Sequence, residues 1–470
     1  MNRLATAIFL AIFFCAGGVT ATAEESLRFG RFGNVFIYRQ SPNPSHVVIF
    51  VSGDGGWNLG VVDMAKTLSY HDALVIGVDI TRYLRELANS KESCLYPAGD
   101  FEMLSKFVQK SFQFPRYVTP VLVGYSSGAT LVYGILAQAP PNTFRGAISL
   151  GFCPDLDLSN SLCRGYGLEW RPGPKGKGFI FLPAKTLDTP WIALQGTMDQ
   201  VCDPAATEAF VKQVKGGKIV VLPKVGHGFA VQRNWMPQFK EVFMDLVQKR
   251  DKAGSQELED LKDLPIIELQ SKNPRADLFA VILSGDGGWA AIDRDLGHSL
   301  AEKDISVVGL NSLQYFWKRR SPDETGKDLE RILTHYFSLW GQGKVMLIGY
   351  SLGADVLPFM VNRLTPEVSN RVSLVALLGP SDRVTFEFHL RDWLAESSSS
   401  DSLPVLPEVS RLGVRKILCF CGEKETGSLC SKMDPQRTRT FVLPGAHHFD
   451  GKYNSIAETI IKEMSESSQQ

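Results

Sequence analysis

"LIGYSLGADVLPFMV", residues 347–361, holds a serine between two glycines, after an apolar run and before a helix-forming one. The Gly-x-Ser-x-Gly pattern at a strand-to-helix junction is typical of a tight turn that exposes a nucleophilic serine. A small residue is needed two positions away on each side, because a Cβ there would collide with neighbouring backbone. The turn also opens a helix, whose N-terminus favours developing negative charge. The sequence therefore predicts that Ser351 is a nucleophile.

The same pattern surrounds Ser126 in "VLVGYSSGATLVYGI", and two other features are also duplicated. The residues "SGDGGW" stand at 52–57 and again at 284–289, each time after an apolar run. A "VLP" triplet leads into His227 in one half and into His447 in the other. The spacing between equivalent residues drifts slowly along the chain. This drift predicts a tandem duplication of one domain rather than an array of short repeats.

Each half alternates short β-branched runs with longer amphipathic stretches. This alternation predicts an α/β fold, with a mostly parallel sheet flanked by helices in each half. A chain of 470 residues with 44% hydrophobic content can form two such domains. We expect them at residues 25–250 and 265–466, joined by a charged linker at 251–264. The duplicated motifs fall at the carboxyl ends of strands, where sheets of this kind bind ligands.

A serine at its ordinary pKa needs a base, and the base needs an acid that orients it. In chain order we expect the acid between the serine and the histidine. In the first half, Asp199 follows a strand-like run between Ser126 and His227. These three residues are the predicted catalytic set of that half.

In the second half, His447 is the predicted base for Ser351. Two acids stand between them in "CGEKETG". Alignment of the two halves places Glu425 opposite Asp199 and makes it the preferred acid, with Glu423 as a rival.

The "SGDGGW" stretches follow an early strand, where this architecture supplies part of an oxyanion hole. In the second half we assign the backbone N–H groups of Asp286 and Leu352 to that role. A plainer interpretation is a tight turn with Trp289 as a core plug. Both interpretations hold together if the packed indole fixes the loop that carries the donor.

The first 23 residues resemble a secretory signal peptide cleaved after Ala23, with an arginine, an apolar run and "ATA". An uncleaved anchor and a lipoprotein cysteine at Cys15 are the alternatives. Export to an oxidising compartment permits disulfides among the seven remaining cysteines. We expect two local disulfides and one long-range disulfide, and Cys419 as a buried thiol. The three expected pairs are Cys153–Cys163, Cys421–Cys430 and Cys94–Cys202.

Fifty basic and fifty acidic residues give a net charge of zero. The chain therefore lacks the basic field that holds nucleic acid by its phosphates. The cysteine spacings do not match a zinc site, so no metal and no cofactor are predicted.

These motifs allow a family to be named. The second half resembles the AcvB/VirJ family of bacterial periplasmic virulence-associated proteins, which have an α/β-hydrolase fold. The segments "LSGDGGWAAIDRDLG", "YFWKRRSPDETGKDLERIL", "LIGYSLGADVLPFMVNRL" and "LPGAHHFDG" carry the resemblance, over most of residues 280–452. The first half is similar more loosely, and the two-domain layout resembles AcvB.

The resemblance implies hydrolysis of an aminoacylated phospholipid, chiefly lysyl-phosphatidylglycerol, in the periplasm. It also implies a link to virulence and, for the VirJ branch, to type IV secretion. Transferred residue by residue, the nucleophile is Ser351, the base His447 and the acid Glu425. A cationic lysyl group would seek carboxylates such as Asp286, Asp355 or Asp382, although helix or turn capping explains each of these acids individually.

Two other functions stay open. One is a general serine esterase or lipase, because a fold does not fix a substrate. The other is a non-catalytic binding partner of a secretion system, with dispensable serines. Complete serine–acid–histidine sets in both halves favour an enzyme, and the tighter family resemblance favours the second half as its active domain.

Overall fold

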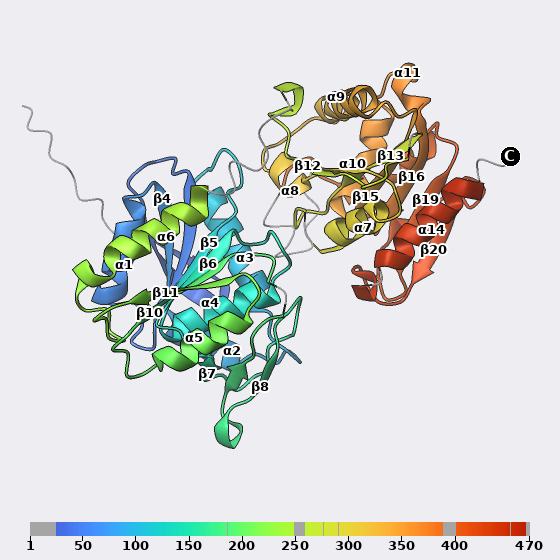
Figure 1. The fold of residues 1–470 in the computed structure, drawn as a ribbon. Coiled ribbons are helices and arrows are strands. Elements are labelled where there is room, and N and C mark those ends of the chain that lie inside the picture. Colours follow the sequence, from blue (N-terminus) through green and yellow to red (C-terminus); the bar gives the residue numbers. More distant parts are fainter. Residues whose placement is uncertain are drawn as a thin grey trace, which may run out of the picture.

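The computed structural model describes residues 25–185, 187–248, 259–275, 277–289, 291–388, 401–451 and 453–466. The described chain forms two lobes, each built on its own large sheet (Figure 1). The predicted signal peptide and the first part of the predicted linker lie outside the described residues. The end of that linker is described, and there Leu261 and Leu264 are buried in the core of the second lobe.

The first sheet has eight strands within the described residues, in the order β1-β2-β4-β3-β5-β6-β10-β11. Its pairs are parallel except at one edge, where β1–β2 and β2–β4 are antiparallel. The strands are β1 (Glu25–Phe29), β2 (Gly33–Tyr38), β3 (His46–Val51), β4 (Ala73–Val78), β5 (Val121–Tyr125), β6 (Gly146–Leu150), β10 (Trp191–Gly196) and β11 (Gly217–Leu222).

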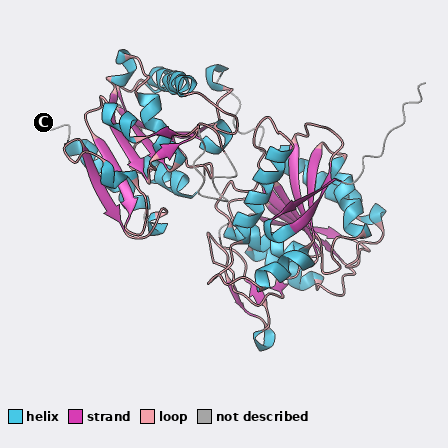
Figure 2. Ribbon diagram, turned by 180° about the vertical axis from the view of Figure 1, so that it is seen from behind, coloured by secondary structure: helices cyan, strands magenta, loops and turns pink. Residues whose placement is uncertain are grey.

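Helices cover both faces of this sheet (Figure 2). In β3, Val47, Ile49 and Val51 face one core while Val48 and Phe50 face the other, which explains the uninterrupted apolar run. Helices α1 and α6 cover one face, and α2 to α5 cover the other. The helices are α1 (Leu59–Ser69), α2 (Ile80–Ala88), α3 (Pro97–Ser111), α4 (Ser127–Gln138), α5 (Pro204–Gln213) and α6 (Met236–Gln248).

A small three-stranded sheet interrupts the first lobe between β6 and β10. It pairs β7 (Asp155–Leu156) and β8 (Trp170–Pro172) with the central β9 (Phe179–Phe181).

The second sheet has seven strands in the described chain, in the order β12-β14-β13-β15-β16-β19-β20. Only its edge pair β12–β14 is antiparallel. The strands are β12 (Ile266–Leu269), β13 (Leu278–Leu283), β14 (Val307–Leu310), β15 (Lys344–Tyr350), β16 (Val372–Leu378), β19 (Ile417–Gly422) and β20 (Thr438–Leu443), and a separate pair joins β17 (Arg383–Val384) to β18 (Leu403–Pro404).

Within the described residues, two helices cover one face of the second sheet, and the others lie on the opposite face. The first group is α7 (Ala291–Ala301) and α14 (Tyr453–Glu466), and the second is α8 (Ser312–Tyr315), α9 (Pro322–Trp340), α10 (Leu352–Val361), α11 (Pro366–Ser369) and α13 (Leu406–Arg411). Six strands have the same order in both lobes, because β4-β3-β5-β6-β10-β11 corresponds to β14-β13-β15-β16-β19-β20. The predicted α/β fold and its duplication are therefore confirmed.

The disulfide pairing differs from the sequence prediction. The bonded pairs are Cys94–Cys163, Cys153–Cys202 and Cys419–Cys430, and Cys421 is the buried free thiol. The predicted pairs Cys153–Cys163, Cys421–Cys430 and Cys94–Cys202 are wrong, as is the free Cys419. Neighbouring strands explain one change, because Cys153 follows β6 and Cys202 follows the adjacent strand β10. In β19, Cys419 and Cys421 are two positions apart and face the same core, so spacing alone could not choose between them.

No helix within the described ranges is both long and apolar enough to cross a membrane.

Candidate active sites

Both motif serines stand on the predicted strained turn. Ser126 has φ 55° and ψ −123°, and Ser351 has φ 51° and ψ −119°, a region that side-chain-bearing residues rarely adopt. The flanking glycines are required by close backbone contacts. A Cβ on Gly128 would lie 2.3 Å from the Ser52 carbonyl oxygen, and one on Gly353 would lie 2.1 Å from that of Leu283. Each serine therefore sits at the end of a central strand, β5 or β15, directly before a helix.

The first lobe brings its three predicted residues together in one hydrogen-bonded chain. Ser126 Oγ lies 2.9 Å from His227 Nε2, and His227 Nδ1 lies 2.9 Å from Asp199 Oδ2. Asp199 is buried and also accepts hydrogen bonds from the backbone N–H groups of Val201 and Cys202, each 2.9 Å long. Burial alone would raise the pKa of Asp199, but the hydrogen bonds from His227 and the two N–H groups hold it below its ordinary value. The carboxylate is therefore ionised and can orient the imidazole.

The second lobe assembles the histidine and the acid. His447 Nδ1 lies 2.5 Å from Glu425 Oε1, and the Gly422 N–H donates to the other carboxylate oxygen at 3.1 Å. Burial would raise the pKa of Glu425, yet these hydrogen bonds lower it below its ordinary value. The rival Glu423 is exposed on the same loop. The structure thus pairs Glu425 with the histidine.

The serine and histidine of the second lobe are not joined by a hydrogen bond, although Tyr350, directly before Ser351, packs against His447 with its ring centroid 5.3 Å away. Across the described residues, Ser351 makes no side-chain hydrogen bond with His447. The imidazole lies against Gly379, where a Cβ would be 2.7 Å from its Cε1 atom. The second site therefore has the serine, the acid and the histidine of a triad, but the hydrogen bond between serine and histidine is not formed.

One residue in each lobe escaped the sequence prediction. Tyr125 donates a hydrogen bond to the His227 carbonyl at 3.1 Å, and the Tyr350 hydroxyl lies 2.9 Å from His448 Nδ1 and 3.4 Å from the His447 carbonyl. Each tyrosine thus fixes the loop of its histidine from the position before the serine. The repeated "GYS" was the available signal.

The "SGDGGW" loops run beside the serines, as predicted for an oxyanion loop. A Cβ on Gly285 would lie 3.4 Å from Ser351 Cβ. The N–H of Leu352, at the start of α10, makes no hydrogen bond within the described chain and is available to an oxyanion. Trp289 is buried, and its ring fills the space that a Cβ on Gly309 would need. The core-plug interpretation of the tryptophan is therefore correct, and it places the predicted donor loop of Asp286 next to the serine.

The two sites differ in their buried carboxyl groups. Asp355, in the first turn of α10, accepts a 2.6 Å hydrogen bond from the Ser381 N–H. Burial raises its pKa well above the ordinary value, and the nearby Asp286 and Glu425 raise it further. Asp293 is also buried, its pKa is likewise raised well above normal by burial, and its Oδ1 has no hydrogen-bond partner in the described chain.

In the first lobe the equivalent positions are Val61 and Thr130, which carry no charge. Thr130 ties its helix to Cys153, as Asp355 ties α10 to Ser381, so capping explains part of the role of Asp355. The third acid considered from sequence, Asp382, is exposed and pairs with Lys432.

Asp199, Cys202 and His227 lie close enough together to suggest a metal site. However, the sulfur of Cys202 is bonded to Cys153, and His227 already joins Ser126 to Asp199. A disulfide-bonded sulfur cannot serve as a thiolate ligand. The arrangement fits a braced acid loop better than a metal centre.

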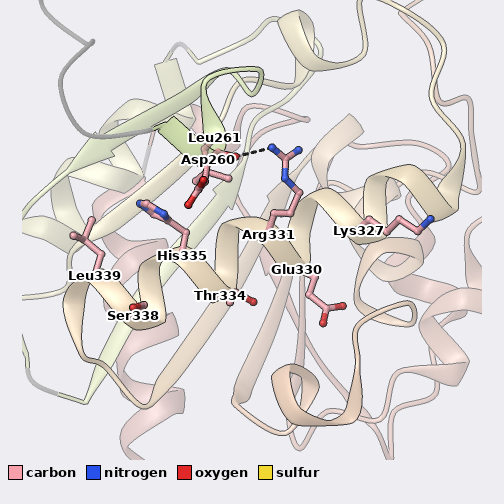
Figure 3. Close-up of a pocket in the computed structure, with 9 residues that line it drawn as sticks. All are labelled: Asp260, Leu261, Lys327, Glu330, Arg331, Thr334, His335, Ser338 and Leu339. Atoms are coloured by element: carbon pink, nitrogen blue, oxygen red, sulfur yellow. Dashed lines mark hydrogen bonds between the residues drawn. The ribbon is translucent and has the colours of Figure 1, made fainter.

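A separate groove of about 570 Å³ lies along α9 beneath the segment at Asp260 and Leu261 (Figure 3). It includes His335 and Ser338, one turn apart on the same helix. Neither residue stands on a strained turn or pairs with an acid in the described chain. The groove therefore offers no nucleophile comparable to the two elbow serines.

No curated protein matches this chain at a significant level. Among solved structures, it is similar to Est1E from Butyrivibrio proteoclasticus (14% identity, TM-score 0.33, covering 48% of this chain and 98% of that chain). It is also similar to esterase 2 from Thermogutta terrifontis (14%, 0.34, 49% and 96%) and to an alpha-beta serine hydrolase homologue from Coxiella burnetii (17%, 0.31, 50% and 99%). The family model of the bacterial virulence protein VirJ matches residues 45–149 and 277–468, more than half of the chain, and the protein therefore belongs to the VirJ family.

Proposed function

We propose that this protein is a serine-type ester hydrolase and that its second domain cleaves the aminoacyl ester of lysyl-phosphatidylglycerol. The observation that carries the proposal is the Glu425–His447 pair beside Ser351, which stands on a strained turn at a helix N-terminus. This set of groups is suited to acyl transfer.

In the proposed reaction, His447 Nε2 takes the proton of Ser351 Oγ as the oxygen attacks the aminoacyl carbonyl carbon. Glu425 holds the imidazole by Nδ1 and stabilises its cationic form. The N–H of Leu352 and that of Asp286 stabilise the oxyanion. The lipid hydroxyl leaves with the proton from His447, and water then releases lysine from Ser351 in a second step. Substrate binding brings Ser351 and His447 into hydrogen-bond distance, as often happens when an empty site is filled.

A cluster of carboxyl groups favours the proposal that the acyl group of the substrate is cationic. Asp286 raises the pKa of both Asp293 and Asp355, and Glu425 raises that of Asp355, so Asp286 lies near both buried acids and Glu425 lies near Asp355. Burial raises the pKa of Asp293 and that of Asp355, which favours the neutral form of both acids when no cation is bound. An entering ammonium would lower those pKa values, and the ionised carboxylates would then stabilise it.

The proposed location is the periplasm, and three disulfides in the described chain favour an oxidising compartment of this kind. Family membership supports a role in bacterial virulence. Interaction with type IV secretion components and contact with the membrane surface belong to the same proposal.

Lysine release from lysyl-phosphatidylglycerol vesicles by the full chain tests the proposal, with Ser351→Ala and Ser126→Ala in parallel. We expect release to be lost only in Ser351→Ala. Loss only in Ser126→Ala would move the activity to the first domain. If wild type cleaves a simple ester but releases no lysine, the substrate is wrong and a general esterase remains. If neither substrate is cleaved, the protein acts by binding.

A further inference from the structure

Apolar side chains are exposed on the two loops that carry the acid and the histidine of the first site. Met198 is 60% exposed and Val201 is 68% exposed, and they flank the acid Asp199. Val231, 47% exposed, follows His227 by four residues. We call Met198, Val201 and Val231 the apolar rim. Exposed apolar side chains beside a catalytic site favour an apolar substrate, because contact removes the apolar surface of both from water.

The second site has a different surface at the same positions. When the acids and the histidines of the two halves are aligned, the apolar rim corresponds to Lys424, Gly427 and Gly451. All three are exposed and none presents an apolar side chain. The surfaces at these positions have therefore diverged, although both sites keep a serine, a histidine and an acid.

The interior of the first site also carries fewer acidic side chains than that of the second. Val61 and Thr130 stand where the second site buries the carboxyl groups of Asp293 and Asp355. The loop that carries His227 also forms a pocket of about 100 Å³, and Val225, Phe229 and Val231 contribute to its lining while His227 does not. Without those two buried acids, the first site offers a cationic acyl group less compensation for leaving water, while it offers an aliphatic chain an apolar contact.

We propose that the first domain is a second ester hydrolase, whose substrate is an ester of an uncharged aliphatic acid. The joined chain Ser126–His227–Asp199 supplies its chemistry. This inference goes beyond the aminoacyl hydrolysis proposed for the second domain and does not depend on it.

In the first step, Ser126 Oγ forms a bond to the acyl carbon while His227 Nε2 accepts the serine proton. The bond between the acyl carbon and the alcohol oxygen breaks, and the alcohol leaves with the proton from His227. Water then attacks the acyl-serine, again giving its proton to His227. The fatty acid departs and Ser126 regains its proton, so no further reactant is needed.

The test measures hydrolysis of p-nitrophenyl octanoate and p-nitrophenyl acetate by the full chain. We expect Ser126→Ala to lower octanoate hydrolysis by at least about a thousandfold, because the nucleophile is removed. Ser351→Ala should retain it. Loss of octanoate hydrolysis in Ser351→Ala instead would overturn the proposal.

The rim is tested by giving it residues of the second site, in the double variant Met198→Lys, Val201→Gly. We expect kcat/KM for octanoate to fall about tenfold more than kcat/KM for acetate, because the longer chain loses apolar contact. The matched control is Tyr70→Lys, which replaces another side chain of the first lobe that is 70% exposed, at the end of α1. It should change neither value. An equal loss on both esters in the rim variant would contradict the assigned acyl class.

Lysine release measured on the same preparations separates the two proposals. If lysine release fails while octanoate hydrolysis follows Ser126, only the aminoacyl function is wrong. If lysine release follows Ser351 while Ser126→Ala leaves octanoate hydrolysis unchanged, only the present inference is wrong.

Discussion

Ser126 Oγ lies 2.9 Å from His227 Nε2, so the first lobe has its nucleophile and base already joined. The equivalent pair in the second lobe, Ser351 and His447, makes no hydrogen bond within the described chain. A serine that already donates to its base needs no side-chain rearrangement before attack, whereas Ser351 must first meet its imidazole.

A serine-directed fluorophosphonate should therefore label Ser126 faster than Ser351. One hydrogen bond is worth about 1 kcal/mol, so we expect a difference of roughly threefold to tenfold in rate. Peptide mass spectrometry at successive times measures both rates in one sample. Faster labelling of Ser351 would show that the joined geometry of the first lobe has no kinetic consequence.

The acid of each triad should be required only at its own serine. We expect Asp199→Asn to lower Ser126-dependent hydrolysis by roughly a thousandfold to ten-thousandfold, because the imidazole loses the group that orients it. Glu425→Gln should do the same for Ser351. Glu423→Gln is the matched control on the second loop and should leave the rates unchanged. A larger effect of Glu423→Gln than of Glu425→Gln would reverse the assignment.

Asp199 should also make stability depend on pH in the acid range. Its pKa is held below the ordinary value of 3.8, so the folded state binds the proton less readily than the unfolded state. The resulting stabilisation is fully present above about pH 4 and is lost as pH falls through the folded pKa. Urea unfolding of wild type and Asp199→Asn should therefore show free energies of unfolding that converge below about pH 4. A difference that is constant with pH would contradict this.

Ionisation of Asp355 should lower the stability of the folded protein as pH rises, whereas ionisation of Asp199 raises it. Burial raises its pKa well above the ordinary value of 3.8, so the wild type loses stability as pH rises above about 4. In Asp355→Asn the amide oxygen can still accept the Ser381 N–H, but nothing ionises. We expect this variant to gain stability relative to wild type between about pH 4 and pH 7, while lysine release falls. Unfolding curves at several pH values measure the first effect, and equal curves at every pH would disprove it.

The positions of the candidate site residues could be predicted from the sequence because each motif was present twice. The serine turns, the acid and histidine positions and six strands of each sheet follow from alignment of the two halves. The edge strand β12 and the state of the Ser351–His447 pair were missed. An edge strand is fixed by its pairing with β14 rather than by its own pattern, and a hydrogen bond between two side chains depends on rotamers.

The disulfides were mispredicted because their partners meet through the sheet. Cys202 reaches Cys153 because β6 and β10 are neighbours in the sheet, although β7, β8 and β9 lie between them in the sequence. In the structure, Cys153–Cys202 anchors the loop of Asp199, and Cys419–Cys430 closes the loop that carries Glu425.

Removal of these disulfides should therefore affect each site separately. We expect the double variant Cys153→Ser, Cys202→Ser to lose about 2–4 kcal/mol of stability and to lower Ser126-dependent hydrolysis, while Ser351-dependent activity persists. Removal of Cys94–Cys163 is the matched control, because it costs similar stability without touching the acid loop. Thermal unfolding and both activities give the comparison. Equal activity losses in the two double variants would show that Cys153–Cys202 does not hold the Asp199 loop in its active position.

An aromatic cluster of Tyr117, Leu313, Trp317 and Phe388 joins the two lobes, beside the ion pairs Lys110–Glu387 and Arg294–Asp188. The indole N–H of Trp317 donates to the Phe114 carbonyl at 2.9 Å, and its ring lies 5.2 Å from that of Tyr117. On the other side of the cluster, a Cβ on Gly288 would lie 3.3 Å from Leu313 Cβ, so the cluster borders the "SGDGGW" loop of the second site.

Through these contacts the first lobe should help to hold the oxyanion loop of the second. We expect Trp317→Ala to lower kcat for Ser351-dependent lysine release several-fold, because Leu313 loses the ring that supports it, and to leave Ser126-dependent hydrolysis unchanged. Trp317→Phe keeps an aromatic ring and loses only the hydrogen bond to Phe114, which is worth about 1 kcal/mol, so it should recover most of kcat. Kinetics of both activities on both variants make the measurement. A fall in both activities together would point to general unfolding, and an unchanged kcat for lysine release would show that the two lobes act independently.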